Sequence, residues 1–214
     1  MPKRKRQQFA EIETFSNVLH LPFGEKDFAL FGNWSLHFGN ENPVVLELGC
    51  GKGEYTVGLA QKYPDKNFIG VDIKGNRIWR GAKTAIEKKM KNVAFLRTMI
   101  DGIASAFGKK EVSEIWITFP DPQPKKENKR LTAQIFLERY KSILQKNGII
   151  HLKTDSRELY DYTLGVISKN KHELIDSSCN LYAEQGRDEV KSIQTYYEEK
   201  FLKQEKKIAY IKFR

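Results

Sequence analysis

The sequence lacks several features by which large classes of protein are recognised. Its 214 residues include only two cysteines, Cys50 and Cys179, so a framework of disulfide bonds is not expected. No run of about 18 consecutive apolar residues occurs, so we expect neither a membrane-spanning helix nor a membrane partner. The basic N-terminus has no apolar secretion-signal core. These absences together predict a cytoplasmic protein.

Two further absences narrow the chemistry. The four histidines show no spacing typical of metal ligands, so no metal site is expected. A dinucleotide fingerprint, G-x-G-x-x-G, would begin at Gly49 and Gly51, but its third glycine position is occupied by Glu54. The phosphate-binding pattern G-x-x-x-x-G-K-[ST] is absent as well. The glycine-rich turn that is present therefore indicates a different ligand.

What the sequence has in excess is positive charge. It contains 37 lysines and arginines against 27 acidic residues, a formal net charge of +10. Such an excess favours a polyanionic partner such as nucleic acid. Basic residues fill positions 3–6, in a run that we interpret as a mobile tail to about Gln8, able to order on RNA phosphates. We predict a basic tail with a short helical extension over 1–40 and one α/β domain over 41–214.

The stretch from Val44 to Glu54 organises the chain. An apolar run turns into alternating glycines and then into a segment of helical periodicity, which predicts a buried strand, a tight turn and a helix. Glycines adopt positive φ at no steric cost and let the backbone pass close to a ligand, and the helix N-terminus offers free N–H groups there. The carboxylate of Glu47 would repel a pyrophosphate but suits a cationic ligand with an amino group. S-adenosylmethionine (SAM) is such a ligand.

The glycine pattern reads E-x-G-x-G-x-G and resembles the first motif of the Rossmann-like SAM-dependent methyltransferases. Its cofactor-binding glycines would be Gly49, Gly51 and Gly53. Asp72 follows Gly51 by 21 positions, near the offset at which an acid binds ribose hydroxyls, although a surface turn would also accommodate it. Asp101 follows the next predicted strand, where an acid can accept from the adenine amino group. Asp-Gly is also an ordinary turn, so that assignment is the weaker of the two.

Strand and helix signals alternate along the rest of the chain, which is typical of a doubly wound sheet. The aromatic-rich stretch 9–42 predicts one or two short helices packed over that sheet. By analogy with methyltransferases, we expect an α/β, Rossmann-like, mostly parallel seven-stranded sheet with an antiparallel last strand and helices on both faces. After 44–48, the predicted strands are 67–72, 93–99, 111–119, 148–153 and 207–213, and the predicted helices are 74–90, 132–144 and 157–168.

A second informative stretch runs from Ile117 to Lys126. Three prolines within five residues predict a stiff, extended loop that holds Asp121 at the carboxyl end of its strand, beside the expected SAM methyl group. A cluster of cations directly behind the loop could contact phosphates that flank a presented base, although a solvated run of charge would look the same. The cluster consists of Lys125, Lys126, Lys129 and Arg130.

Five motifs together give a more specific resemblance. ELGCGKG, FIGVD, FPDPQPKKENKR, KTDS and TYYE are similar to the motifs of the bacterial tRNA (guanine-N7-)-methyltransferases, over about residues 40 to 214. The resemblance implies transfer of a methyl group from SAM to guanine N7 at position 46 of the tRNA variable loop. It also implies that Glu47, Asp72, Asp101 and Asp121 line the SAM and catalytic region. The implied substrate-binding residues are Lys125, Asp155, Thr195, Tyr196, Tyr197 and Glu198.

The chain departs from the family pattern at two places. The family usually has tryptophan after FPDP, whereas this chain has Gln123. The basic-aromatic pair that usually follows the threonine of the last motif is replaced by Tyr196 and Tyr197, so only the flanking Thr195 and Glu198 carry over directly.

The implied chemistry needs no proton abstraction, because guanine N7 already carries a lone pair. In-line placement should supply most of the rate acceleration. Asp121 could stabilise the positive charge that develops on the base, or it could orient guanine together with Asp155. We hypothesise that Asp121 positions guanine and stabilises charge rather than acting as an obligatory base.

Two rival functions are compatible with the sequence. One is methylation of the N6 amino group of adenine, whose motif resembles Pro120–Gln123 but requires a second proline and an aromatic residue. The other is a non-catalytic RNA-binding module on the same fold. The first rival would act on nucleic acid and the second would bind RNA, whereas the resemblance implies tRNA as the partner. The protein could be a monomer or a homodimer.

Overall fold

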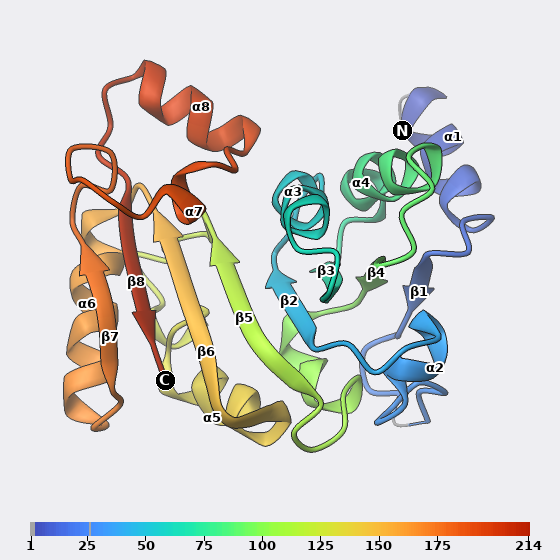
Figure 1. Cartoon of the computed structure of the whole chain (residues 1–214), viewed down its shortest axis with the longest axis horizontal. Helices are drawn as coiled ribbons and strands as arrows, with labels where there is room; N and C mark the ends of the chain where they lie inside the picture. The colour runs from blue at the N-terminus through green and yellow to red at the C-terminus, as the bar shows by residue number, and fades with distance from the viewer. Residues whose placement is uncertain (1–2, 26) are drawn as a thin grey trace.

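A computed structural model describes residues 3–25 and 27–214. Their centre is one eight-stranded sheet of order β1-β4-β3-β2-β5-β6-β8-β7, drawn in Figure 1. The strands are β1 (Val18–His20), β2 (Val44–Leu48), β3 (Asn67–Asp72), β4 (Val93–Arg97), β5 (Val112–Thr118), β6 (Leu144–Thr154), β7 (Leu174–Ser178) and β8 (Ala209–Phe213).

The direction of the strands confirms the predicted sheet. Strands β1 to β6 pair in parallel, and β8 runs antiparallel to both β6 and β7. The sheet has one strand more than the seven predicted, because Val18–His20 pairs with β4 at the edge. A strand of three residues gives no alternation long enough to be recognised in the sequence. The carboxyl ends of the parallel strands meet along one side of the sheet, here named the carboxyl edge.

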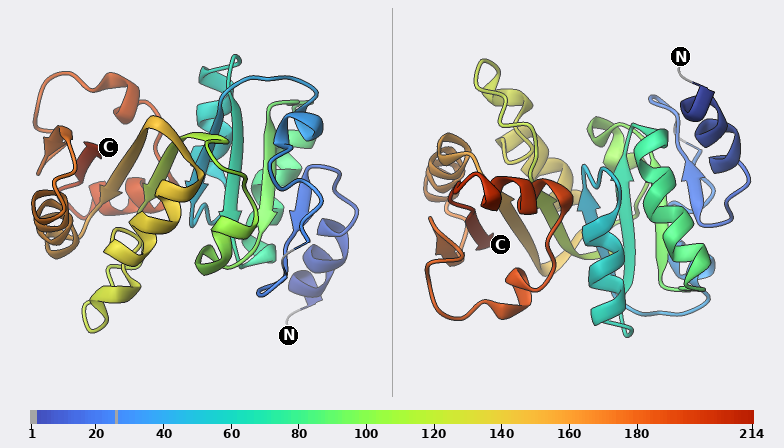
Figure 2. Two further views of the ribbon diagram at one scale, coloured as in Figure 1. Left: turned by 90° about the horizontal axis from the view of Figure 1, so that it is seen from below. Right: turned by 90° about the horizontal axis from the view of Figure 1, so that it is seen from above.

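Helices cover both faces of the sheet, as predicted. One buried cluster joins α3 and α4 to the strands, and the other joins α5 and α6 to the opposite face (Figure 2). The late helices α7 and α8 pack on the α3 side. The helices are α1 (Lys3–Ile12), α2 (Trp34–Phe38), α3 (Glu54–Lys62), α4 (Gly75–Glu87), α5 (Gln134–Ile143), α6 (Arg157–Lys169), α7 (Asp188–Lys191) and α8 (Tyr196–Lys203), with 3₁₀ turns η1 (Ile100–Ser105) and η2 (Glu127–Lys129).

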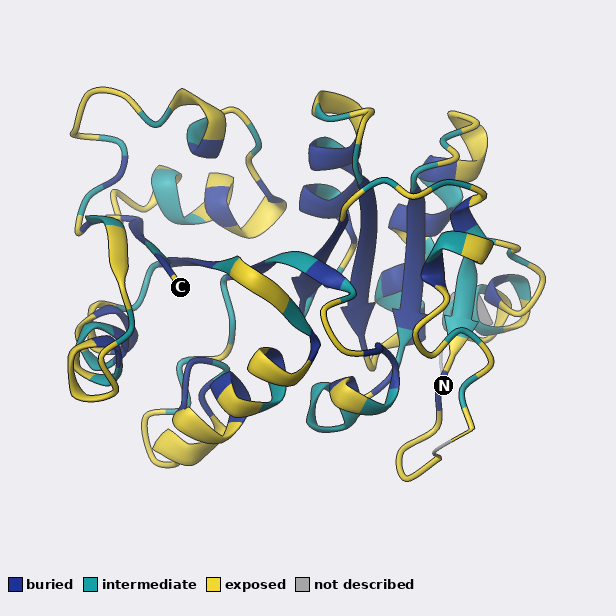
Figure 3. Ribbon diagram, turned by 60° about the horizontal axis from the view of Figure 1, so that its bottom comes forward, coloured by how far each residue is buried: buried dark blue, intermediate teal, exposed yellow. Residues whose placement is uncertain are grey.

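The ring of Phe95 is the tightest packing feature beneath the glycine turn. A Cβ atom added to Gly53, Gly70 or Gly81 would lie within 2.5–2.7 Å of that ring. The absence of side chains at these three positions therefore lets α3, β3 and α4 close around one aromatic residue. Strands β2 and β3 are buried along their whole length in Figure 3, as expected for a parallel sheet covered on both faces.

The N-terminal residues from Lys3 onward form a helix that packs on α4 through its last turn. Helix α1 begins at Lys3, and Glu11 on this helix accepts hydrogen bonds from Trp79 Nε1 at 2.8 Å and Lys83 Nζ at 2.7 Å on α4. Residues 1–2 of the predicted tail lie outside the described residues, and the division at residue 40 stays a prediction. No helix among the described residues is long and apolar enough to cross a membrane.

Candidate active site

The glycine turn connects β2 to α3 at the carboxyl edge. Gly49, Gly51 and Gly53 all have positive φ, between 55° and 76°. The three glycines nevertheless differ in what surrounds them. An added Cβ would meet no atom closer than 4.0 Å at Gly49 or Gly51, whereas at Gly53 it would strike Phe95. Gly49 and Gly51 therefore present open backbone to a ligand, while Gly53 serves the packing of α3.

Asp72 lies beside this turn at the end of β3 and is mostly buried. Its two carboxylate oxygens accept hydrogen bonds from Gly51 N at 3.0 Å and Lys74 N at 2.8 Å. Each oxygen retains a further lone pair, so the carboxylate can also accept from the two hydroxyls of a ribose. The structure thus brings Asp72 to the position that the spacing predicted.

A cavity of about 430 Å³, here named the edge cavity, opens along these residues. Asp101 lies in η1 and is on the wall of this cavity. Its carboxylate is 3.5 Å from Arg139 Nη1. An ordinary turn had been the alternative interpretation of Asp101. The lining also includes residues that the sequence analysis did not select, among them Thr98 and Leu131. The principal lining residues are Gly49, Asp72, Thr98, Asp101, Gln123 and Lys129.

Glu47 occupies a different position from the acids on the cavity wall. Its side chain is buried and accepts hydrogen bonds from the backbone N–H of Thr56 at 2.8 Å, from the Thr56 hydroxyl, and from the Thr118 hydroxyl at 2.6 Å. Burial raises the pKa of this carboxyl to about 7, against the opposing effect of the threonine hydrogen bonds. Glu47 therefore connects β2, α3 and β5 under the turn and does not line the edge cavity.

The loop after β5 carries Asp121 over the same edge. The expected extended path is interrupted, because Phe119 and Gln123 have positive φ of 48° and 46°. Asp121 is exposed, and its Oδ1 accepts a hydrogen bond from Gln123 N at 3.1 Å. Gln123, which replaces the family's tryptophan, contributes to the edge cavity, whereas Asp121 is not on its wall.

The basic cluster behind this loop divides into two kinds of residue. Lys125, Lys126 and Lys129 are exposed, and Lys126 and Lys129 line the edge cavity. Arg130 is buried, donates to the carbonyl of Pro122 at 2.9 Å and forms an ion pair with Glu158. The expectation of four phosphate-binding cations is therefore wrong for Arg130, which fixes the loop to α6.

The remaining predicted substrate residues lie on β6 and α8. Asp155 follows β6 and pairs with Lys206 at 2.7 Å. Thr195 caps α8 by accepting a hydrogen bond from Glu198 N, and Glu198 itself is fully buried. Tyr196 and Tyr197 are 53% and 44% exposed. The helix α8 was not predicted, because its few apolar residues give only a short periodic signal.

The residues of this edge fit SAM. The edge cavity falls in the size range of small-ligand sites, and the open backbone at Gly49 and Gly51 leaves room that side chains would fill. Asp72 offers free lone pairs to a ribose, and Asp101 offers an acceptor to an adenine amino group. Among the described residues, no group of three or more histidine, cysteine or acidic side chains could hold a metal ion.

Comparisons with known proteins agree with this geometry. A family model described as "Putative methyltransferase" matches residues 41–211. The tRNA (guanine-N(7)-)-methyltransferase of Christiangramia forsetii is 52% identical, with 99% of this chain and 98% of the relative covered. That of Bacteroides thetaiotaomicron is 49% identical, with 100% of this chain and 86% of the relative covered.

Solved structures support the fold alone, because their identities are low. The crystal structure of the 16S rRNA methyltransferase KamB gives a TM-score of 0.65 at 13% identity, covering 85% of this chain and 93% of that one. An antibiotic-related methyltransferase gives 0.64 at 18% identity, covering 93% and 96%. Because the relatives of high identity cover nearly the whole chain, this chain belongs to the family of SAM-dependent tRNA (guanine-N(7)-)-methyltransferases.

Proposed function

We propose that this protein transfers the methyl group of SAM to N7 of a guanine in tRNA, at position 46 of the variable loop. The observation that carries the proposal is the convergence of an open glycine turn, Asp72 and the Asp121 loop around one cavity at the carboxyl edge. The family of the chain supports the choice of tRNA and of N7. The site residues named below are part of the proposal.

SAM supplies an electrophilic methyl group on a sulfonium centre, and guanine N7 supplies the lone pair. The protein must then bind and align the two reactants. We assign the ribose to Asp72, the adenine amino group to Asp101, and the close approach of the cofactor to the backbone at Gly49 and Gly51. Glu47 supports the turn from below through its hydrogen bonds to Thr56 and Thr118.

Asp121 is proposed to orient guanine and to stabilise the positive charge that forms on the methylated base. The hydrogen bond from Gln123 N holds one of its oxygens, so the other can accept from a base N–H. Asp121→Asn should reduce turnover about tenfold or more while SAM affinity stays unchanged. Unchanged turnover in this variant would remove Asp121 from the reaction.

Binding of tRNA is assigned to the exposed lysines Lys125, Lys126 and Lys129, with Asp155 and the α8 N-terminus nearby. Each phosphate contact releases counterions, so the affinity for tRNA should fall steeply as salt increases. Because its substrate is tRNA, we propose that the protein acts in the cytoplasm. Analytical ultracentrifugation with and without tRNA would distinguish a monomer from a homodimer.

The central test is incubation with isotopically labelled SAM and unmodified tRNA, followed by nucleoside mass spectrometry. We expect labelled 7-methylguanosine, mapped to the variable loop by fragmentation of the tRNA. A guanine-to-adenine substitution at position 46 of the tRNA is the matched control and should abolish labelling. Labelled N6-methyladenosine, or no label at all, would contradict the proposal.

A further inference from the structure

Lys153 is a buried charge next to the proposed site. It lies in β6, two residues before Asp155, and its side chain is 0% exposed. Its ammonium donates to the carbonyl oxygens of Val190 at 3.0 Å and Ile193 at 3.3 Å, and it lies 2.7 Å from Glu198 Oε1. Burial lowers the pKa of Lys153, and the charge of Glu198 opposes that effect. One ammonium thus holds three points of the segment that follows β7.

The carboxylate of Glu198 is fully paired with other residues of the protein. Its side chain is 0% exposed, and besides Lys153 it accepts a hydrogen bond from the Tyr182 hydroxyl at 2.8 Å. Its backbone N–H donates to the Thr195 hydroxyl, which caps α8. A carboxylate with these partners has no exposed surface with which to contact an RNA.

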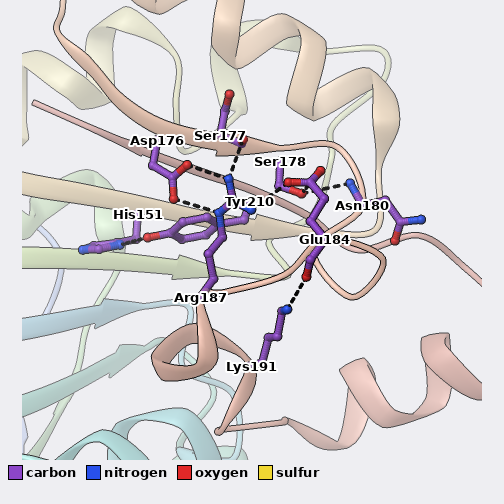
Figure 4. A network of polar contacts seen from close by, with 9 residues as sticks. All are labelled: His151, Asp176, Ser177, Ser178, Asn180, Glu184, Arg187, Lys191 and Tyr210. Carbon is purple, nitrogen blue, oxygen red and sulfur yellow. Dashed lines mark hydrogen bonds and ion pairs between the residues drawn. The ribbon is translucent and has the colours of Figure 1, made fainter.

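The chain between β7 and α8, residues 179–195, is also fixed near its middle by Arg187. The Arg187 guanidinium donates to both oxygens of Asp176 on β7, each at 2.8 Å, and to Glu184 at 2.7 Å (Figure 4). This outer anchor is partly exposed, whereas the Lys153–Glu198 pair is completely buried. Surface ion pairs contribute little to stability, so the inner pair should dominate the placement of this segment.

Helix α8 is held against both functional loops. Tyr196 N donates to Glu54 Oε2 at 2.8 Å, and Lys52 Nζ lies 4.2 Å from the Tyr196 ring, so Tyr196 lies beside the glycine turn. On the next turn, the ring of Phe201 lies 6.3 Å from the Tyr197 ring and 5.8 Å from the ring of Phe119. Phe119 is the first residue of the Asp121 loop. Tyr196 therefore contacts the glycine turn directly, and Tyr197 is connected through Phe201 to the first residue of the Asp121 loop.

We infer that Lys153 and Glu198 are positioning residues, which hold the start of α8 so that the rings of Tyr196 and Tyr197, rather than the carboxylate of Glu198, contact the RNA. The inference rests on the proposed tRNA substrate. Exposed aromatic rings bind RNA by stacking on unpaired bases, and a rigid support keeps the rings available for that contact. An isolated buried ion pair adds little net stability compared with an apolar pair of similar volume, so its use here fits a role in fixing geometry.

The test compares three variants with the wild type in the full-length protein. Lys153→Met with Glu198→Met replaces the ion pair by an apolar pair and should preserve folding, while Val190 and Ile193 lose their anchor. We expect its KM for tRNA to rise about tenfold, with SAM affinity unchanged and with faster proteolysis within 179–195. Tyr196→Ala with Tyr197→Ala should raise KM similarly but leave protease resistance intact. Lys200→Met, an exposed lysine of α8, is the matched control and should change neither property.

Two results would overturn the inference. In one, the Met–Met variant is cleaved faster but keeps the wild-type KM for tRNA, so the placement of the segment does not matter for binding. In the other, the double tyrosine variant binds tRNA as the wild type does. Failure of the proposed function is recognised separately, because the wild-type protein itself would then produce no 7-methylguanosine.

Discussion

Two regions of the carboxyl edge each bury one glutamate, and they stabilise it in opposite ways. Under the glycine turn, Glu47 is surrounded by neutral donors, the N–H of Thr56 and the hydroxyls of Thr56 and Thr118. In the first turn of α8, Glu198 faces the ammonium of Lys153 and the hydroxyl of Tyr182. Neutral donors only partly offset the cost of burying the charge of Glu47, whereas Glu198 has an opposite charge next to it. The identity of the partner, more than the depth of burial, distinguishes the two carboxylates.

From this comparison we expect the effects of Lys153 and Glu198 on the free energy of unfolding to be coupled. Lys153→Met alone would leave Glu198 buried without a cation and should reduce the free energy of unfolding by about 3–5 kcal/mol. Adding Glu198→Met should recover most of that loss, because the uncompensated charge is removed. Urea denaturation of the two single variants and the double variant measures this coupling. Additive effects of the two substitutions would contradict it.

Glu47 should respond to pH. Its pKa is 4.5 in the unfolded chain and about 7 in the fold, so between these values the folded state binds a proton that the unfolded state releases. Stability should therefore fall as pH rises from 4.5 to about 7, by about 3 kcal/mol, and level off above that range. Glu47→Gln should remove this part of the pH dependence. Identical pH profiles of unfolding for the variant and the wild type would show that Glu47 does not titrate in this way.

Asp72, at the edge cavity beside the glycine turn, should affect the cofactor more than the fold. Asp72→Asn keeps the shape of the side chain but offers fewer acceptor sites, so SAM affinity should fall about tenfold or more. Isothermal titration with SAM measures the change. Asp65→Asn, on the exposed turn after α3, is a matched control and should bind SAM normally.

The smallest effect is expected for single lysines around the Asp121 loop. Lys129→Ala should reduce the slope of log affinity for tRNA against log salt by about 1, with turnover nearly unchanged. Lys88→Ala, at the far end of α4, is the control, with no expected change in slope. An unchanged slope for Lys129→Ala would show that this lysine does not contact a phosphate.

The two regions also differ in how well the sequence predicted them. The glycine turn is encoded by adjacent residues, so β2, β3 and the position of Asp72 follow from one short stretch and its spacing. The α8 region depends on Lys153 and Glu198, which lie 45 positions apart and whose contact no local pattern indicates. The same limit explains why the burial of Arg130 was not predicted, because its partner Glu158 lies on a different element, α6. Local patterns predicted strands and turns, while tertiary partners decided which charges face solvent.

The ring of Phe95, with Gly53, Gly70 and Gly81 packed around it, has a consequence for the evolution of this site. A methyl group added at any one of these glycines would clash with the ring unless the ring moves or residue 95 is smaller. A smaller residue at position 95 alone would leave a void beneath the cofactor turn. The four positions should therefore change together across divergent relatives or not at all. A lineage that exchanges Phe95 for a smaller side chain should carry the compensating alanine or serine at position 70, because Gly53 has a positive φ and a Cβ at Gly81 would also lie 2.7 Å from the carbonyl oxygen of Lys52.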